Sequence, residues 1–204
     1  MKLAIKTAPE KLPVEVETAI EFAKIDDDKV EIIELFIGSA TELVEAYIGR
    51  ALINRTYTLS LNDWPEVPNG SEWWDGVRDG PISSLVASAA VELPKPPTVS
   101  ISEVRVFDAD NQSSIVDTAS YQLELDTMGA KLHPVGTWPI PGRDIDGIQI
   151  DYVAGYGADP AAVNPAIRTA ILHSFVELYE KRGGDGVVPA IAKPLLNSWR
   201  VLRL

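Results

Sequence analysis

Few side chains in this 204-residue sequence could carry catalysis or hold a metal ion. There is no cysteine, which excludes a disulfide framework, a thiolate zinc site and a cysteine nucleophile. The two histidines, His133 and His173, are far apart in the sequence, and neither has carboxylates around it at metal-ligand spacing. We expect His173 to be buried and hydrogen-bonded on a helix face, and His133 to lie in a loop before Pro134. The sequence therefore predicts no catalytic residue, no metal and no cofactor.

Three acids, Asp144, Asp146 and Asp151, come closest to a metal or hydrolytic site. Their spacing in RDIDGIQID lacks the oxygen-rich loop and terminal bidentate glutamate of a calcium site, so a solvated β edge is the better interpretation. A hydrolase that uses Asp144 and Asp146 is an alternative function, although the sequence shows no set of catalytic residues that supports it. The segment VAGYGAD matches neither of the phosphate-binding motifs GK(S/T) and G-x-G-x-x-G. A strand-to-helix turn explains its glycines.

Composition and charge exclude several classes of protein. Hydrophobic residues make up 46% of the chain, as in an ordinary globular protein. The 30 acids and 18 bases give a formal net charge of -12, so the surface as a whole repels nucleic-acid phosphates and anionic membranes. No apolar run has the length of a membrane span, and the apolar stretch after Lys2 is too short for a signal peptide. We expect a soluble, intracellular protein that binds no membrane.

Hydrophobic periodicity predicts the elements that must position any functional surface. Apolar residues recur at helical spacing near residues 27–48, after three aspartates, and again near 161–182 before two glycines. A strand is expected at 2–7, a short helix from Val14 and another near 194–198. Short β-type runs separated by turn residues fill the middle, including a hairpin at DADNQ, whereas WPEVPNGSEWWDGVRDGP is expected to be irregular.

These elements predict an α+β fold: a small α-helical bundle, with the helix near 27–48 packed on the helix near 161–182, carrying a mostly antiparallel β insertion. The predicted domains are a helical core of residues 1–50 and 158–204 with a C-terminal docking tail, and a β-rich insertion of residues 51–157.

Charge is distributed unevenly between the first long helix and the C-terminus. Residues 14–47 contain ten acids and two bases, whereas residues 181–204 contain five bases and one acid. The tail also combines aromatic, arginine and aliphatic residues, the types that anchor protein interfaces. A solvated helix and a frayed terminus would be the simplest interpretation, and a docking tail is the functional one. The candidate tail residues are Leu195, Leu196, Trp199, Arg200, Val201, Leu202, Arg203 and Leu204. The candidate acids for a channel or a subunit contact are Asp27, Asp28, Glu31, Glu34, Glu42 and Glu45.

Several segments occur in an order that resembles a known family. They are EAYIGRAL, LNDWPEV, LPKPPTVSISEVRVFDADN, a SYQLE strand, a GTWP turn, YVAGYGADPAAVNPAIRTAILHSFVELYEKRG and the closing VPAIAKPLLNSWRV. Together they resemble the head-tail connector proteins, also called adaptors or head completion proteins, of long-tailed phages and of gene transfer agents. The resemblance covers nearly the whole chain. One departure is the long middle region with Trp73 and Trp74, where some connectors are shorter and purely helical.

The resemblance implies a non-enzymatic virion protein at the head-tail junction, made in the bacterial cytoplasm. It implies a ring, typically of twelve copies, that binds the portal ring through the C-terminal tail and receives a tail-side stopper or terminator protein. DNA would pass through the ring without specific binding, and an acidic lumen would suit that passage. The acids named above are then candidates for the channel or for contacts between copies.

A ligand- or carbohydrate-binding module on the β region is the alternative function. It is suggested by Trp64, Trp73, Trp74 and Trp138, because exposed aromatic rings stack on sugars.

Overall fold

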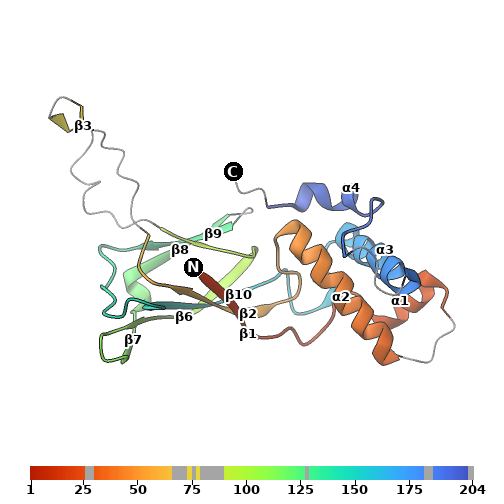
Figure 1. Ribbon diagram of the computed structural model, residues 1–204, viewed down its shortest axis with the longest axis horizontal. Coiled ribbons are helices and arrows are strands. Elements are labelled where there is room, and N and C mark those ends of the chain that lie inside the picture. Colours follow the sequence, from red (N-terminus) through yellow and green to blue (C-terminus); the bar gives the residue numbers. More distant parts are fainter. Residues whose placement is uncertain are drawn as a thin grey trace. The chain divides into compact units, whose positions relative to one another are not determined.

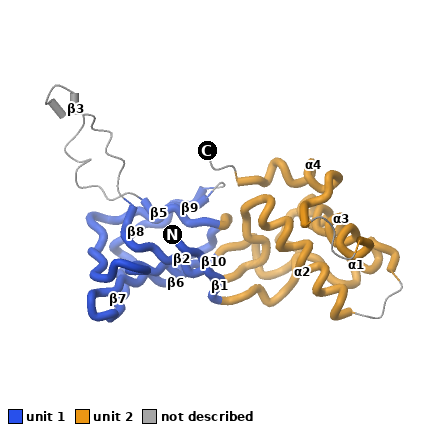
Figure 2. The backbone as a smooth tube through the Cα atoms, viewed as in Figure 1, with its two compact units in different colours: residues 1–6, 56–94, 98–153 blue, residues 7–55, 95–97, 154–204 orange. Residues whose placement is uncertain are grey.

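The chain folds into two compact units, which are described separately (Figure 2). The computed structural model describes residues 1–25, 30–65, 73–74, 77–78, 90–126, 129–181 and 186–201. The strand unit consists of residues 1–6, 56–94 and 98–153, and the helical unit consists of residues 7–55, 95–97 and 154–204. The predicted domain boundaries near residues 50 and 158 remain a prediction.

Two antiparallel sheets build the strand unit (Figure 1). The five-stranded sheet has the order β1-β2-β10-β6-β7, and the three-stranded sheet has the order β5-β9-β8. In the first sheet the strands are β1 (Lys2–Thr7), β2 (Arg55–Leu61), β10 (Ile148–Ala154), β6 (Thr98–Phe107) and β7 (Ser113–Ile115). In the second they are β5 (Val91–Leu93), β9 (Gly129–Pro134) and β8 (Tyr121–Asp126). A separate two-residue pair joins β3 (Trp73–Trp74) to β4 (Val77–Arg78), inside the segment that was expected to be irregular.

Burial follows the position of each strand in its sheet. The central strand β10 is almost entirely buried or half-buried, with Ile148, Ile150 and Tyr152 inaccessible to solvent. The edge strand β1 is exposed along nearly its whole length. Tyr152 stacks on Tyr57 of β2 and donates from its hydroxyl to the Pro94 carbonyl at 2.7 Å. Because its hydroxyl has a hydrogen-bond partner, the Tyr152 side chain can be buried in the core of the strand unit.

The helical unit is built on a pair of long helices. α2 (Val30–Ile48) packs against α3 (Pro165–Lys181), and α1 (Val16–Ala23) contacts both. α4 (Lys193–Leu196) follows, with short 3₁₀ turns at η3 (Pro160–Ala162) and η4 (Asn197–Trp199); a third, η2 (Thr118–Ser120), belongs to the strand unit. The fully buried residues recur at helical spacing, as predicted. They are Ile33, Ile37, Ala40, Val44 and Ile48 on α2, and Ile167, Ala170, Ile171 and Phe175 on α3.

Gly49 ends α2 in the left-handed region, with φ +74°, and its N–H donates to the Glu45 carbonyl at 3.0 Å. This is the conformation that glycine adopts most readily at a helix C-terminus.

The predicted small helical bundle with a β insertion is wrong. The molecule is α+β, but its strands exceed what an insertion in a small bundle would hold, and they form a five-stranded and a three-stranded sheet. β1 precedes every helix in the sequence and still belongs to the larger sheet. The long amphipathic helices were recognised because hydrophobic periodicity is clearest in long elements. The sheets were not recognised, because short strands form a sheet only by pairing with distant segments, and that pairing cannot be read from local sequence.

Candidate functional site

The C-terminal segment, residues 186–201, packs on both long helices: α4 contacts α3, and residues 197–201 contact the end of α2. Tyr47 donates from its hydroxyl to the Asn197 Oδ1 atom at 2.9 Å, and the Arg200 guanidinium lies 4.7 Å from the centre of the Tyr47 ring. The Arg50 Nε–H donates to the Trp199 carbonyl at 2.6 Å. These contacts hold the predicted docking residues against the helical unit, up to the point where the chain continues into Leu202, Arg203 and Leu204, which lie outside the described residues.

The predicted docking residues divide into inner and outer groups. Leu196 is completely buried in the core of the helical unit, and Leu195 and Trp199 pack against that core as half-buried residues. The indole of Trp199 meets the ring of Tyr156 edge-on. Arg200 is exposed, and Val201 is half-buried. Leu196 therefore anchors the segment, and Arg200 is the exposed one among the predicted docking residues that the structure describes.

The candidate acids also divide by burial. Glu31, Glu34 and Glu42 are exposed on α2, whereas Glu45 is only 6% exposed; Asp27 and Asp28 lie outside the described residues.

The Glu45 carboxylate Oε1 atom accepts from the Arg55 guanidinium at 2.6 Å and from the Leu52 N–H at 2.9 Å. Burial raises the pKa of Glu45, and the positive charge of Arg55 offsets this only in part. Glu45 is thus a buried structural carboxylate, while the other three described acids form a solvent-facing negative surface.

Asp151 is the second buried carboxylate, and its predicted place on a solvated β edge is wrong. It lies on the central strand β10 with 1% exposure. Its Oδ2 atom accepts from Lys6 of β1 at 2.6 Å and from Arg105 of β6 at 2.9 Å, and the Thr58 hydroxyl of β2 donates to its Oδ1 atom at 2.5 Å.

Burial by itself would raise the pKa of Asp151, but the hydrogen bonds from Lys6 and Thr58 together with the charge of Arg105 more than reverse that, so its pKa is lowered. The carboxylate therefore links β10 to β1, β2 and β6. Asp144, in contrast, is exposed and Asp146 is half-buried.

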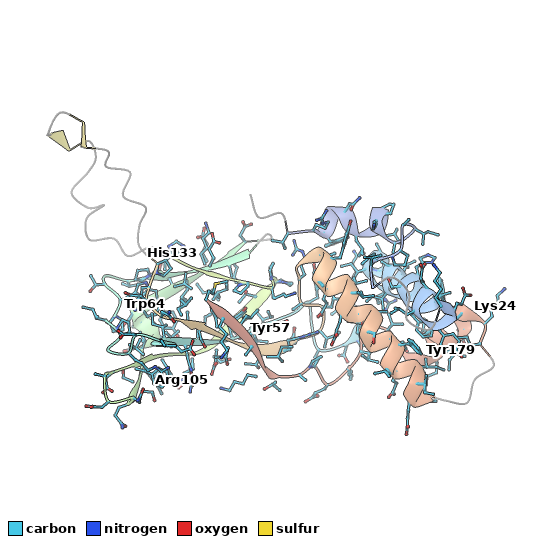
Figure 3. The ribbon with its side chains drawn as sticks, in the orientation of Figure 1. Lys24, Tyr57, Trp64, Arg105, His133 and Tyr179 are labelled. Carbon is cyan, nitrogen blue, oxygen red and sulfur yellow. The ribbon has the colours of Figure 1, made fainter. Side chains whose placement is uncertain are left out.

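Both histidines and the tryptophans Trp64 and Trp138 contact neighbouring side chains, whereas the side chains of Trp73 and Trp74 lie outside what the structure describes. His133 lies in β9 rather than in a loop, and its Nε2 atom is 2.7 Å from the Glu124 Oε2 atom (Figure 3). His173 is half-buried and meets the Phe22 ring edge-on. Trp64 and Trp138 stack with ring centroids 4.0 Å apart, and both are buried. Two rings that cover each other offer no open face for a sugar, which removes two of the four tryptophans behind the ligand-binding alternative.

The described residues meet the requirements of neither a metal site nor a membrane-spanning helix. Among the residues that the structure describes, no group of three or more histidine, aspartate or glutamate side chains could hold a metal ion. No described helix has both the length and the apolar composition of a membrane span. The acidic face of α2 and the partly anchored C-terminal segment are the two surface features that the candidate residues form.

No protein-family model and no curated protein matches the sequence, whereas solved structures do. A chain in the neck of an empty gene transfer agent particle, computed with C6 symmetry, aligns with a TM-score of 0.79 at 21% identity. A chain in the virion of the native particle aligns with a TM-score of 0.77 at 20% identity, and one in the native neck computed with C12 symmetry with 0.71 at 20%. Each alignment covers 100% of this chain and 97% of the other. The sequence resemblance is confirmed at the level of fold.

Sequence reasoning missed the residues that hold the C-terminal segment in place. Tyr47 and Arg50 stand about 150 positions before their partners, and nothing in their immediate surroundings indicates a contact across that separation. The one available signal was EAYIGR itself, where an aromatic residue and an arginine flank a helix-ending glycine.

Proposed function

We propose that this chain is a head-tail connector: a structural protein that forms a ring at the neck of a phage-like particle and continues the DNA channel. The observation that carries the proposal is the likeness of fold over the full chain to neck chains of a gene transfer agent particle. A match that leaves neither chain with an unaligned domain supports a shared role of the whole polypeptide more than a shared module would. In this proposal the protein catalyses no reaction.

The C-terminal segment is the proposed contact with the portal ring. Its buried residue Leu196 and the hydrogen bond from Arg50 to Trp199 fix where the chain leaves the helical unit. Arg200 is exposed at that exit, and Leu202, Arg203 and Leu204 follow it. Arginine is enriched among the residues that contribute most to interface energy. A fixed exit point also lowers the entropy cost of ordering the tail on its partner. A tail-side stopper or terminator protein would bind elsewhere on the ring.

The acidic surface of α2 is the proposed neighbour of the channel or of the adjacent copy. Glu31, Glu34 and Glu42 remain in this role, and Glu45 does not because its carboxylate is buried against Arg55. With a net charge of -12, a ring of such chains would present DNA with a surface that does not retain its phosphates.

The test is to mix the purified chain with the portal protein encoded nearest to it and to image the complexes by electron microscopy. We expect one ring of the full-length chain on each portal. A chain that ends at Val201 keeps every described contact of the C-terminal segment, and we expect it to fold normally and to leave the portal bare. A chain that ends at Gly186 also loses the buried Leu196 and serves as the folding comparison. Failure of the full-length chain to bind an intact portal would contradict the proposal.

A further inference from the structure

One face of α2 is exposed although it carries a large apolar side chain. At about 100° per residue, Glu31, Leu35, Gly38 and Glu42 fall within about 60° of one another on the helix. The buried residues Ile33, Ile37, Ala40 and Val44 occupy the opposite side, where α1 and α3 pack. Leu35 is 69% exposed, and Ile32 beside it is 44% exposed. Glu31, Leu35 and Glu42 are exposed, Gly38 between them is half-buried, and these four residues define the exposed face of α2.

Packing against the described part of its own chain does not require a glycine at position 38. A Cβ atom built on Gly38 meets no described atom within 4 Å outside the helix backbone, and no positive φ distinguishes it. Glycine in a helix interior costs about 1 kcal/mol relative to alanine. A destabilising residue that fills no local need, next to an exposed leucine, fits a surface that another backbone approaches closely.

The C-terminal segment carries the complementary chemistry. Val187 and Ile191 are 61% and 62% exposed, and Lys193 and Arg200 are exposed cations. Residues 186–201 contain these two bases and no acid, whereas Val30–Ile48 contains four glutamates and no lysine or arginine. Apolar residues flanked by opposite charges on the two surfaces match each other as interface halves.

The two surfaces belong to the same helical unit, and within one copy both are open to solvent. The contact of Tyr47 with Asn197 places the last part of the C-terminal segment at the end of α2, whereas α4 contacts α3 (Figure 1). Ile32 lies 15 residues before Tyr47, which is about 22 Å along the helix axis. Leu35 keeps 69% of its surface exposed, so the C-terminal segment of the same copy does not cover it. Two different complementary patches on each subunit generate a head-to-tail interface, which closes into a ring when the rotation between copies allows it.

We propose that the exposed face of α2 in one copy binds the C-terminal segment of the next copy, with Leu35 against Val187 and Ile191, and Glu31 and Glu34 near Lys193. The proposal rests on the ring of the proposed function and names its subunit interface. Gly38 lets the neighbouring backbone approach α2. The same C-terminal segment then serves two purposes: residues 187–193 join neighbouring copies, and the last residues reach the portal.

Disulfide trapping on portal-bound assemblies tests the contact, because the natural chain has no cysteine. The double variant Leu35→Cys with Ile191→Cys should give, after oxidation, a ladder of covalent oligomers on a denaturing gel. An equal mixture of the two single variants should stop at dimers, since each copy then carries one partner only. If the double variant forms portal-bound assemblies of the same size as the wild type but gives only monomers on the gel after oxidation, the proposed interface is overturned.

Charge reversal provides a second measurement that needs no cross-link. Glu31→Lys with Glu34→Lys should lower the number of copies per portal at least tenfold at limiting protein, and adding Lys193→Glu should restore part of the loss. Glu92→Lys with Asp110→Lys makes the same change in net charge on exposed residues of the strand unit and should leave assembly unchanged. Complete rings from the α2 variant would overturn this interface and leave the connector function standing, whereas a wild-type chain that never binds the portal would contradict the function itself.

Discussion

The main-chain N–H of Val201 donates to the carbonyl oxygen of Ile48 at 2.9 Å. Ile48 is the last residue of α2, whose final carbonyl groups have no partner within the helix. The C-terminal segment supplies that partner and thereby attaches the last described residue to the end of the longest helix. In the proposed connector, this attachment sets where the portal-binding residues begin.

Substitution by alanine should change the stability of the protein in opposite directions at Gly38, within α2, and at Gly49, at its C-terminal end. Gly49→Ala places a side chain at φ +74°, so we expect it to destabilise the protein by about 1–2 kcal/mol. Gly38→Ala meets no described atom and should stabilise the helix by about 1 kcal/mol. Urea unfolding of both variants measures the difference. If the subunit interface on α2 is correct, Gly38→Ala should also impair ring assembly despite its greater stability; unimpaired assembly would count against a close approach at Gly38.

The two neighbouring glutamates of α2, Glu42 and Glu45, should differ in their contribution to stability. Glu45→Ala leaves the Arg55 guanidinium buried without its carboxylate, and we expect a loss of about 3 kcal/mol in the free energy of unfolding. Glu42→Ala removes an exposed charge and should change stability by less than about 0.5 kcal/mol. Equal losses in chemical denaturation would show that the Glu45 pair does not stabilise the fold.

The Asp151 cluster predicts a specific dependence of stability on pH. Because the pKa of Asp151 is lowered below 3.8 in the folded chain, its contribution is fully present above that value and is lost as the pH falls through the folded pKa. We therefore expect Asp151→Asn to be less stable than the wild type at pH 7 and the gap to narrow near pH 3. Urea titrations at both pH values measure it. A gap that stays constant would mean that the carboxylate charge contributes nothing.

The stacked pair of Trp64 and Trp138 should behave as core and not as a binding platform. Trp138→Ala removes a buried ring, and we expect a loss of about 3–5 kcal/mol. Trp64→Phe keeps an aromatic ring but loses the hydrogen bond from its Nε1–H to the Pro139 carbonyl at 2.8 Å, so its cost should be smaller. Tryptophan fluorescence of the wild-type chain should not change on addition of simple sugars. A saturable change would revive the ligand-binding alternative.

The sequence predicted long elements and local turns well. The apolar spacing of Ile33, Ile37 and Val44 was sufficient for α2 and its buried face, because helical periodicity is a local property. The hairpin at DADNQ was also predicted correctly: β6 and β7 pair on either side of it, and Asn111 takes φ +61° there.

Contacts between distant residues were beyond the reach of the sequence. Asp151 was expected in solvent because its partners Lys6, Thr58 and Arg105 come from three other strands, and strand pairing decides its burial. Glu45 was grouped with the exposed acids for the same reason, since its partner Arg55 lies beyond the end of the helix. The composition of the C-terminal segment was informative, but its anchoring by Tyr47 and Arg50 became visible only in the folded chain.

The most direct test of the connector function is cryo-electron microscopy of the purified portal mixed with the full-length chain. We expect additional density for one closed ring of this chain on the portal, continuous with its channel, with the residues after Arg200 inserted into the portal surface. An intact portal that shows no added density at saturating concentrations of the chain would contradict the account.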